Sequence, residues 1–144
     1  MQGIETLALR MDRICDNTLA VAKYLEDHSQ VEWVRYAGLD SSPHKALLDK
    51  YMGGRGSGVM SFGVKGGKEA APKFIDALNL ITRLVNIGDA KSLACHPAST
   101  THRQLSPEEL ATSGVSEDLI RLSIGIEHID DIIEDIEQAL EATK

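Results

Sequence analysis

The sequence predicts an α+β fold, with a mainly antiparallel sheet of four or five strands and helices packed on one face of it. Two observations predict this class. Stretches of alternating or β-forming residues occur between helical patterns along the chain, and these strands are few and short. The length of 144 residues and the 42% of hydrophobic residues suit one domain with a real core. We therefore expect residues 1–144 to form a single domain.

Periodicity defines the elements in chain order. Apolar residues recur at the i, i+3, i+4, i+7 spacing of a helix in some segments and alternate with a period of two in others. Helices are predicted over residues 4–27, 43–52, 67–79, 106–113 and 129–140, and strands over residues 31–36, 59–65, 82–87, 92–95 and 119–124. Pro72 is expected in the first turn of its helix, where proline is tolerated.

Local signals define two helix starts and one loop. Ser42 and Pro43 have the residue types of an N-cap and of a first helical position. Residues 106–109 (SPEE) repeat that pattern, with acids near the positive end of the helix dipole. The glycine-rich stretch 53–58 precedes a predicted strand, whereas the glycines of phosphate and dinucleotide loops precede a helix. We expect this stretch to be a flexible surface loop.

Arg121 is the polar residue with the clearest chemical potential. In its strand, Ile120, Leu122 and Ile124 form one apolar face, so the Arg121 guanidinium and the Ser123 hydroxyl fall on the other face. A planar guanidinium can bind a carboxylate through two parallel hydrogen bonds. The pattern leaves three interpretations open: carboxylate recognition, pairing with an internal acid, or an ordinary outer-face arginine.

The other polar residues do not predict a second site. His96 and His102 belong to a Pro-containing loop without a third ligand at close spacing, so hydrogen bonds to backbone are favoured over a metal site. The acidic residues of segment 127–135 are expected mostly on the solvated face of the last helix, with Asp130 and Asp131 in its first turn, where they favour the helix dipole. Cys15 and Cys95 are expected to be reduced and buried, because they lack metal-type spacing.

Charge and hydropathy argue against two kinds of partner. The net charge is −7, and no basic stripe is interleaved with aromatic residues, which argues against nucleic acid. No apolar run is long enough to span a bilayer, and the N-terminus lacks a basic-then-apolar signal pattern. We expect no membrane partner and a cytoplasmic location.

Two long motifs resemble a known family. GDAKSLACHPASTTH at 88–102 and LIRLSIGIEHIDDIIEDIEQAL at 119–140 resemble the C-terminal domain of the pyridoxal-phosphate enzymes of cysteine and methionine metabolism. GIETLALRM, VEWVRYAGL and VMSFGVKGG match too, so the resemblance covers essentially the whole chain. The first motif, with Thr100 where methionine is more usual, is most similar to the O-acetylhomoserine sulfhydrylase branch. Cystathionine γ-synthase and methionine γ-lyase are the alternatives within the family.

The resemblance implies roles for particular residues. Arg121 corresponds to the arginine that grips the substrate α-carboxylate, Ser92 to the serine beside that carboxylate, and Leu93 to the residue whose backbone helps to hold it. The residues that would border the substrate entrance are His96, Thr101 and His102. The intact enzyme would convert O-acetylhomoserine and sulfide to homocysteine and acetate with pyridoxal phosphate, and would be a homo-oligomer, a tetramer in this family.

The family's cofactor-binding groups have no counterpart in this sequence. None of the eight lysines lies in the Ser-x-Thr-Lys context of the lysine that forms the aldimine, and the phosphate-binding and pyridine-binding groups belong to the large domain. We therefore expect no covalent cofactor and no activity from this chain alone, with the large domain and a small amino-acid substrate as its partners. The second hypothesis is a free-standing α+β domain that binds an amino acid or a partner protein.

Overall fold

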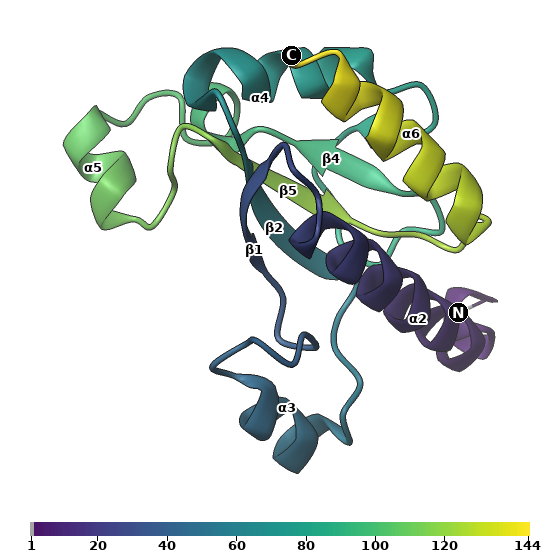
Figure 1. The fold of residues 1–144 in the computed structure, drawn as a ribbon. Coiled ribbons are helices and arrows are strands. Elements are labelled where there is room, and N and C mark those ends of the chain that lie inside the picture. Colours follow the sequence, from purple (N-terminus) through teal and green to yellow (C-terminus); the bar gives the residue numbers. More distant parts are fainter. Residues whose placement is uncertain (1) are drawn as a thin grey trace.

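The computed structural model describes residues 2–144 as a five-stranded sheet with helices against it (Figure 1). In chain order the elements are α1 Gln2–Glu5, α2 Leu7–Glu26, β1 Val31–Arg35, α3 Lys45–Met52, β2 Val59–Val64, α4 Gly67–Ala77, β3 Thr82–Arg83, β4 Leu93–Cys95, η1 Pro97–Ser99, α5 Pro107–Thr112, β5 Leu119–Ser123 and α6 Ile129–Glu141. The predicted α+β class is confirmed.

The sheet has the strand order β1-β2-β5-β4-β3. The pairings β1–β2, β2–β5 and β4–β5 are antiparallel, and only the edge pair β3–β4 is parallel. The sheet is thus mainly antiparallel as predicted, with one parallel edge. β5 lies in the middle, so the strand that carries Arg121 is paired on both sides.

One face of the sheet forms the core. Ile120, Leu122 and Ile124 are fully buried there, and they face the helices α2, α4 and α6 (Figure 1). An edge-to-face contact between Phe62 of β2 and Phe74 of α4, with ring centroids 5.4 Å apart, ties the two layers together. The predicted alternation is confirmed, because Ile120 and Leu122 of β5 and Ile124 just after it face the helices and leave Arg121 on the other face.

Less of the first predicted helix, residues 4–27, is buried than expected. It is interrupted at Thr6, between α1 and α2. Ile4 and Leu7, both expected on the buried stripe, are 72% and 43% exposed, and burial begins only at Ile14. The physical reason is that the N-terminal turns extend beyond the sheet (Figure 1), so their apolar residues have no core to contact.

The predicted strand 82–87 is wrong beyond Arg83. Segment 84–91 leaves the sheet and returns at Ser92, with Leu84, Val85 and Ile87 exposed. The side-chain oxygen of Asn86 accepts the N–H of Ile87 at 2.9 Å, which satisfies locally a donor that a strand would give to its neighbour. The segment therefore has the apolar composition of a strand but does not form one.

The start of one predicted helix and the place of a proline within another also need correction. α3 begins at Lys45, because the Ser42 hydroxyl accepts the N–H of His44 at 3.3 Å within the preceding turn and caps no helix. Pro72 lies past the first turn of α4, which begins at Gly67. The predicted capping box of α5 is confirmed, with Ser106 and Glu109 bonded to each other's backbone N–H groups.

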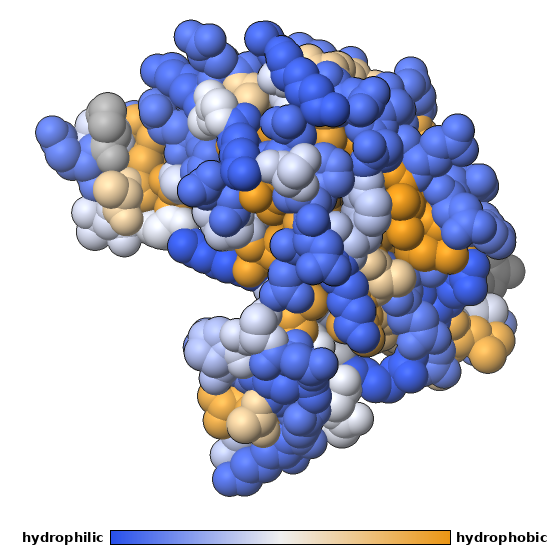
Figure 2. Space-filling view, viewed as in Figure 1, coloured by the Kyte–Doolittle hydropathy of each residue, from blue (hydrophilic) through white to orange (hydrophobic). Residues whose placement is uncertain are grey.

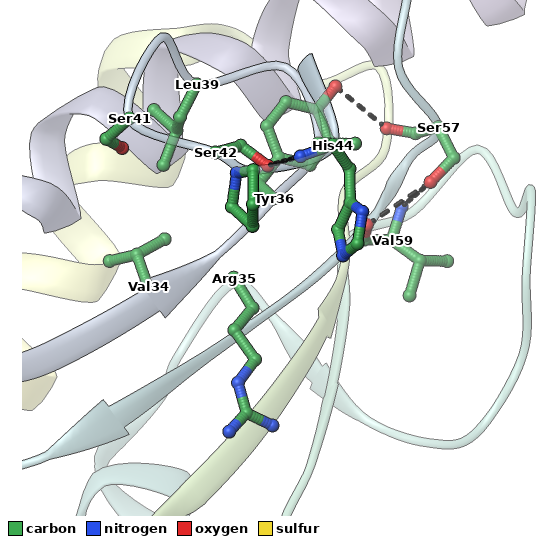
Figure 3. Close-up of a pocket in the computed structure, with 11 residues that line it drawn as sticks. Val34, Arg35, Tyr36, Leu39, Ser41, Ser42, His44, Ser57 and Val59 are labelled. Atoms are coloured by element: carbon green, nitrogen blue, oxygen red, sulfur yellow. Dashed lines mark hydrogen bonds between the residues drawn. The ribbon is translucent and has the colours of Figure 1, made fainter. Parts of the chain in front are cut away.

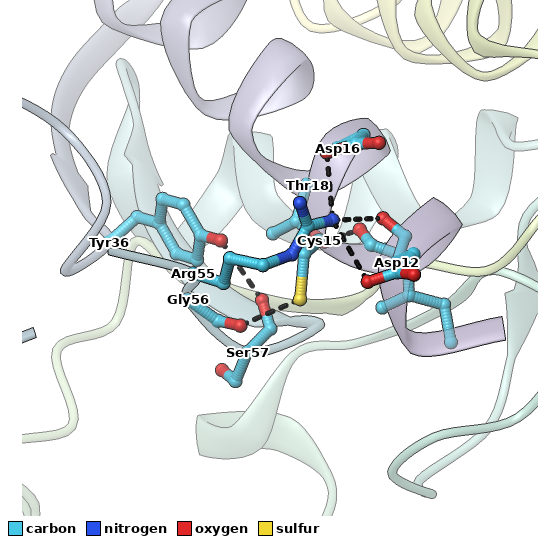
Figure 4. A network of polar contacts seen from close by, with 9 residues as sticks. Asp12, Cys15, Asp16, Thr18, Tyr36, Arg55, Gly56 and Ser57 are labelled. Atoms are coloured by element: carbon cyan, nitrogen blue, oxygen red, sulfur yellow. Dashed lines mark hydrogen bonds and ion pairs between the residues drawn. The ribbon is translucent and has the colours of Figure 1, made fainter. Parts of the chain in front are cut away.

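The glycine-rich stretch precedes a strand as predicted, but it is held rather than free (Figure 4). The Arg55 guanidinium donates to the Asp16 carboxylate at 3.0 Å and to the Asp12 carbonyl at 2.8 Å, both on α2. The Cys15 thiol donates to the Gly56 carbonyl at 2.8 Å. These contacts fasten the loop to α2, which a pattern of glycines alone could not show.

The acid-rich region of α6 differs from the predicted solvated face. Asp130 and Asp131 lie in the first turn, as predicted for the helix dipole. Asp135, by contrast, is only 5% exposed and anchors the turn after α4. The backbone N–H groups that it accepts, at 2.8 to 3.0 Å, are those of Asn79, Leu80 and Ile81.

Candidate functional site

The second face of the sheet carries a row of four side chains, one from each of four adjacent strands. Arg35 of β1 is opposite Ser61 of β2, Ser61 is opposite Arg121 of β5, and Arg121 is opposite Cys95 of β4. Residues directly opposite each other in a sheet have neighbouring side chains. Within residues 2–144 the core helices α2, α4 and α6 lie on the opposite face, and the segments that carry α3 and α5 project to either side of an indentation in the surface (Figures 1 and 2).

Arg121 is half-buried in this row without an acidic partner. None of the ion pairs formed within residues 2–144 includes it. Its Nη2 donates to the carbonyl oxygen of Asn86 at 3.4 Å, which is long for such a bond. Since a guanidinium has five N–H donors, most of its hydrogen-bonding capacity is available. Of the three open interpretations, pairing with an internal acid is the one that the geometry disfavours.

A cavity of about 310 Å³ lies beside Arg121. Its other polar residues are Arg35, Ser61 and His102, and its apolar walls include Pro97 and Leu119. Arg35 lies over the Trp33 ring, 4.5 Å from its centroid. A carboxylate in this cavity would therefore meet a positive and partly desolvated surface, where charge-assisted hydrogen bonds are strongest.

Cys95 forms the buried end of the row. Burial raises the pKa of the Cys95 thiol, and the neighbouring Arg121 guanidinium opposes this effect without cancelling it. The thiol is therefore neutral near pH 7, packed against the arginine, and does not compete as an anion for the guanidinium. Both cysteines are free and buried, as predicted.

Ser92 is placed away from Arg121. It is completely buried, and its hydroxyl donates to a Glu127 carboxylate oxygen at 2.9 Å and accepts the Gly125 N–H at 2.9 Å. Leu93 is on the Arg121 face, opposite Ser123, but it is buried. The residue whose backbone carbonyl accepts a hydrogen bond from Arg121 is instead Asn86, in the segment predicted as a strand.

The three residues predicted at the substrate entrance have different surroundings. His96 is buried: its Nδ1 bonds to Ser99 Oγ at 2.8 Å and its Nε2 to the Glu117 carbonyl at 2.9 Å, so the ring holds the loop together. His102 lines the Arg121 cavity. Thr101 is exposed and bonds to His102 Nδ1 at 2.8 Å. Of the three, His102 is the one that borders the cavity.

Sequence reasoning missed Asn86 and Glu127. Glu127 was expected on a solvated face, yet both its carboxylate oxygens are bonded to Ser92. A signal for Asn86 was available, because an asparagine shortly before Gly88 is typical of a turn rather than of a strand. No local signal distinguishes Glu127 from its acidic neighbours, because its partner is 35 residues away.

A second cavity, of about 400 Å³, lies between the end of β1 and α3 (Figure 3). The Tyr36 hydroxyl there donates to the Ser57 carbonyl at 3.1 Å, and burial raises its pKa to about 12. Arg35 points away from the Tyr36 ring (Figure 3). The Tyr36 hydroxyl and the Ser42 hydroxyl, which accepts the His44 N–H, are engaged within the protein, and we do not assign this cavity a ligand.

The lysines lie apart from the Arg121 cavity. All eight fall within the described residues, and none lines it. Seven are exposed, and the eighth, Lys45, forms an ion pair with Asp49. The surroundings of Arg121 therefore suit the carboxylate of a ligand but contain no amine that could bind a cofactor aldehyde.

Residues 2–144 also lack two features that would point to other functions. They contain no group of three or more histidine, cysteine, aspartate or glutamate residues arranged to hold a metal ion. None of the described helices combines the length and the apolar character needed to cross a bilayer.

The chain is similar to known enzymes over almost its whole length. It is 51% identical over 138 residues to O-acetyl-L-homoserine sulfhydrylase 1 of Thermus thermophilus, covering 96% of this chain and 33% of that protein. It is 52% identical over 141 residues to homocysteine synthase of Schizosaccharomyces pombe (98% and 33%) and 49% identical over 143 residues to L-methionine gamma-lyase of Pseudomonas putida (99% and 36%). The chain thus spans about a third of the length of these relatives.

A solved structure agrees with this similarity. A putative O-acetylhomoserine (thiol)-lyase from Campylobacter jejuni, which contains N′-pyridoxyl-lysine-5′-monophosphate, superimposes with a TM-score of 0.91 at 44% identity, covering 97% of this chain and 33% of that one. The model of the family described as Cys/Met metabolism PLP-dependent enzyme matches residues 1–141. The match, the fold and the unpaired arginine agree, and the chain belongs to this family of pyridoxal-phosphate-dependent enzymes of cysteine and methionine metabolism.

Proposed function

We propose that this chain is the C-terminal, substrate-carboxylate-binding domain of an O-acetylhomoserine sulfhydrylase. The intact enzyme would exchange the acetate of O-acetylhomoserine for sulfide and release homocysteine. Support for this reaction comes from an O-acetyl-L-homoserine sulfhydrylase and a homocysteine synthase that are 51% and 52% identical to the chain. The observation that carries the proposal is the half-buried guanidinium of Arg121, which borders a cavity and has no acidic partner among the described residues.

The residues of this chain fit the substrate side of such a site and do not fit the cofactor side. The Arg121 cavity has cationic and hydroxyl groups for a carboxylate, but no lysine. When bound to the intact enzyme, pyridoxal phosphate supplies the stabilisation of negative charge at the substrate's carbon atoms. We assign its binding to residues outside this chain.

Arg121 would act by orientation. Two parallel N–H···O bonds fix a carboxylate in position and direction, and a fixed carboxylate limits the rotation of the rest of the substrate. The neutral Cys95 thiol and the Asn86 carbonyl restrict the guanidinium from two sides. Leu93 remains part of the proposal as a residue of β4, which pairs with the strand of Arg121. Ser92 remains as the residue just before β4, and His102 as a residue of the cavity wall.

The direct experiment is steady-state kinetics of the enzyme that carries this chain. Arg121→Ala should lower kcat/KM for O-acetylhomoserine about 10- to 150-fold, the equivalent of about 1.5–3 kcal/mol for a hydrogen bond to a charged group. Most of the change should appear as a higher KM for the amino acid, with the KM for sulfide unaltered. An unchanged kcat/KM for O-acetylhomoserine would refute the proposed role of Arg121.

Methionine γ-lyase is the second candidate, because the Pseudomonas relative is 49% identical over 143 residues, almost as similar as the sulfhydrylases. The products separate the two activities. A sulfhydrylase forms homocysteine from O-acetylhomoserine and sulfide, whereas a lyase releases a thiol and a 2-oxo acid from methionine. Cystathionine γ-synthase would instead require cysteine as the thiol donor.

The hypothesis of a free-standing binding domain has its own test. Calorimetric titration of this chain alone with O-acetylhomoserine and with methionine would detect an amino-acid site that is complete without other residues. Our proposal expects no saturable binding, because the residues of this chain contact only the carboxylate of the substrate and we assign the rest of the site to residues outside the chain. Saturable binding that Arg121→Ala abolishes would instead favour the free-standing domain.

A further inference from the structure

Segment 84–91, between β3 and β4, brings the Asn86 carbonyl to Arg121. Leu84, Val85 and Ile87 in this segment are exposed, so little apolar burial holds it in place. At one end the N–H of Leu84 donates to the Ala94 carbonyl at 3.2 Å. The position of the segment therefore depends on polar contacts: the Arg10 guanidinium donates to the Gly88 carbonyl at 3.2 Å, and a group of hydrogen bonds holds the other end.

Glu127 makes the strongest of these contacts. One carboxylate oxygen accepts the Ser92 N–H at 2.6 Å and the other accepts the Ser92 hydroxyl at 2.9 Å. The same hydroxyl accepts the Gly125 N–H at 2.9 Å, and the Ile126 N–H donates to the Ala90 carbonyl at 2.9 Å. Four hydrogen bonds, two of them to a charged group, thus join the end of segment 84–91 to the turn between β5 and α6.

This junction is closely packed as well as hydrogen-bonded. Ser92 is fully buried, and a Cβ atom on Gly125 would lie 2.3 Å from the Ala90 carbonyl oxygen. On the other side, the Asn17 side chain of α2 donates to the carbonyls of Gly125 and Glu127, both at 3.0 Å. The Glu127 carboxylate therefore lies between a fixed turn and the segment that reaches Arg121.

We propose that Glu127 is a positioning residue of the substrate-carboxylate site. It holds Ser92, Ser92 fixes the end of segment 84–91, and the segment in turn holds the Asn86 carbonyl against the Arg121 guanidinium. This inference rests on the proposed function of Arg121. Glu127 itself contacts neither Arg121 nor the cavity beside it.

The first test uses this chain alone and does not depend on any activity. In hydrogen–deuterium exchange, Glu127→Ala should accelerate exchange of the Ser92 amide and of segment 84–91 by about 10-fold or more, because a carboxylate acceptor is lost. Glu127→Gln keeps one carbonyl acceptor and should have a smaller effect. Glu134→Ala, which removes an exposed carboxylate from α6, is the matched control and should leave the segment unchanged.

The second test uses the enzyme that carries this chain. Glu127→Ala should raise the KM for O-acetylhomoserine about 5-fold, roughly the value of one hydrogen bond, while the KM for sulfide and the protein's cofactor content stay constant. Glu127→Gln should lie between Glu127→Ala and the unmodified enzyme. If Glu127→Ala does not fold, Glu127→Gln and Ser92→Ala provide the same comparison, since each removes part of the junction.

The outcomes separate this inference from the proposed function. Unchanged exchange in segment 84–91 would overturn the inference, and so would faster exchange with an unchanged KM for O-acetylhomoserine. If Arg121→Ala itself leaves kcat/KM unchanged, the proposed function fails, whatever the Glu127 variants do.

Discussion

Arg121 has surroundings that favour ligand binding over stability. Taking a guanidinium partly out of water costs free energy, and an acidic partner inside the protein would offset this cost. The structure supplies instead a neutral thiol, a serine and one carbonyl at 3.4 Å. A local arrangement that is unfavourable for folding is expected where a site is prepared for a charge that arrives with the ligand.

Asp135 shows the opposite arrangement, a buried charge whose partners are all internal. Asp135→Ala should lower the free energy of unfolding by about 2–3 kcal/mol, because it leaves the N–H groups of Asn79, Leu80 and Ile81 without their charged acceptor. Urea denaturation followed by circular dichroism measures this change. The exposed control Glu134→Ala should stay within about 0.5 kcal/mol of the unmodified chain. Equal effects of the two substitutions would contradict a structural role for Asp135.

The two cysteines should react slowly in the folded chain. Burial raises the pKa of both the Cys15 and the Cys95 thiol. The thiolate is the reactive form, so a raised pKa lowers reactivity at pH 7 to 8, and burial limits access as well. Titration with a thiol-reactive disulfide reagent should show both groups as slow in native protein and fast in denaturant. Rapid reaction of Cys95 in the native chain would mean that its thiol is accessible to the reagent, and would contradict its burial beside Arg121.

At the scale of elements, the close packing of β1 against β2 requires a glycine at position 63. A Cβ atom on Gly63 would lie 2.1 Å from both Trp33 Nε1 and the Asp118 carboxylate, which are hydrogen-bonded to each other at 2.7 Å. Gly63→Ala should therefore destabilise the chain by about 1–3 kcal/mol through overpacking. Gly3→Ala, in exposed α1, has no contact closer than 4.0 Å and should be neutral or slightly stabilising. Thermal denaturation of both variants distinguishes these results, and a neutral Gly63→Ala would refute the close packing.

Strands and helices with strong periodicity could be predicted, and excursions from the sheet could not. The alternation around Ile120 and Leu122 fixed the buried face of β5 and placed Arg121 correctly. Segment 84–87 has the apolar composition of a strand, but it leaves the sheet. The Ile87 N–H is bonded to the Asn86 side chain, and Ser92, after the segment, is bonded to Glu127. Glu127 and Asp135 were predicted on a solvated face, but the structure places both against hydrogen-bond partners. Those partners are distant in the sequence, and the periodicity of a helix carries no information about them.

At the scale of the whole molecule, the two faces of the sheet have different roles. The face with Ile120 and Leu122 packs against α2, α4 and α6 and supplies the core. The opposite face carries Arg35, Arg121 and the cavity beside them. The chain spans about a third of the length of its relatives, and we propose that the rest of an intact enzyme completes the site from this open side.

The isolated chain should form no specific imine with pyridoxal phosphate. Its lysines lie apart from the Arg121 cavity, so any imine would form weakly and without preference among exposed amines. Absorption spectroscopy, followed by borohydride reduction and peptide mapping, measures this. A stable imine band that maps to one lysine, and that is lost when that lysine is replaced, would show that the chain holds a cofactor site of its own.

The central claim is that Arg121 binds the substrate carboxylate. The most direct measurement removes the carboxylate from the substrate and, separately, the guanidinium from the protein. In the enzyme that carries this chain, the binding of O-acetylhomoserine is compared with that of its analogue in which hydrogen replaces the carboxylate, for the unmodified protein and for Arg121→Ala. We predict that the unmodified enzyme prefers the carboxylate form by about 10-fold or more and that Arg121→Ala loses this preference, because a charge-assisted contact is worth about 1.5–3 kcal/mol. An equal preference for the carboxylate in both proteins would show that another group binds it, and would contradict the role given to Arg121.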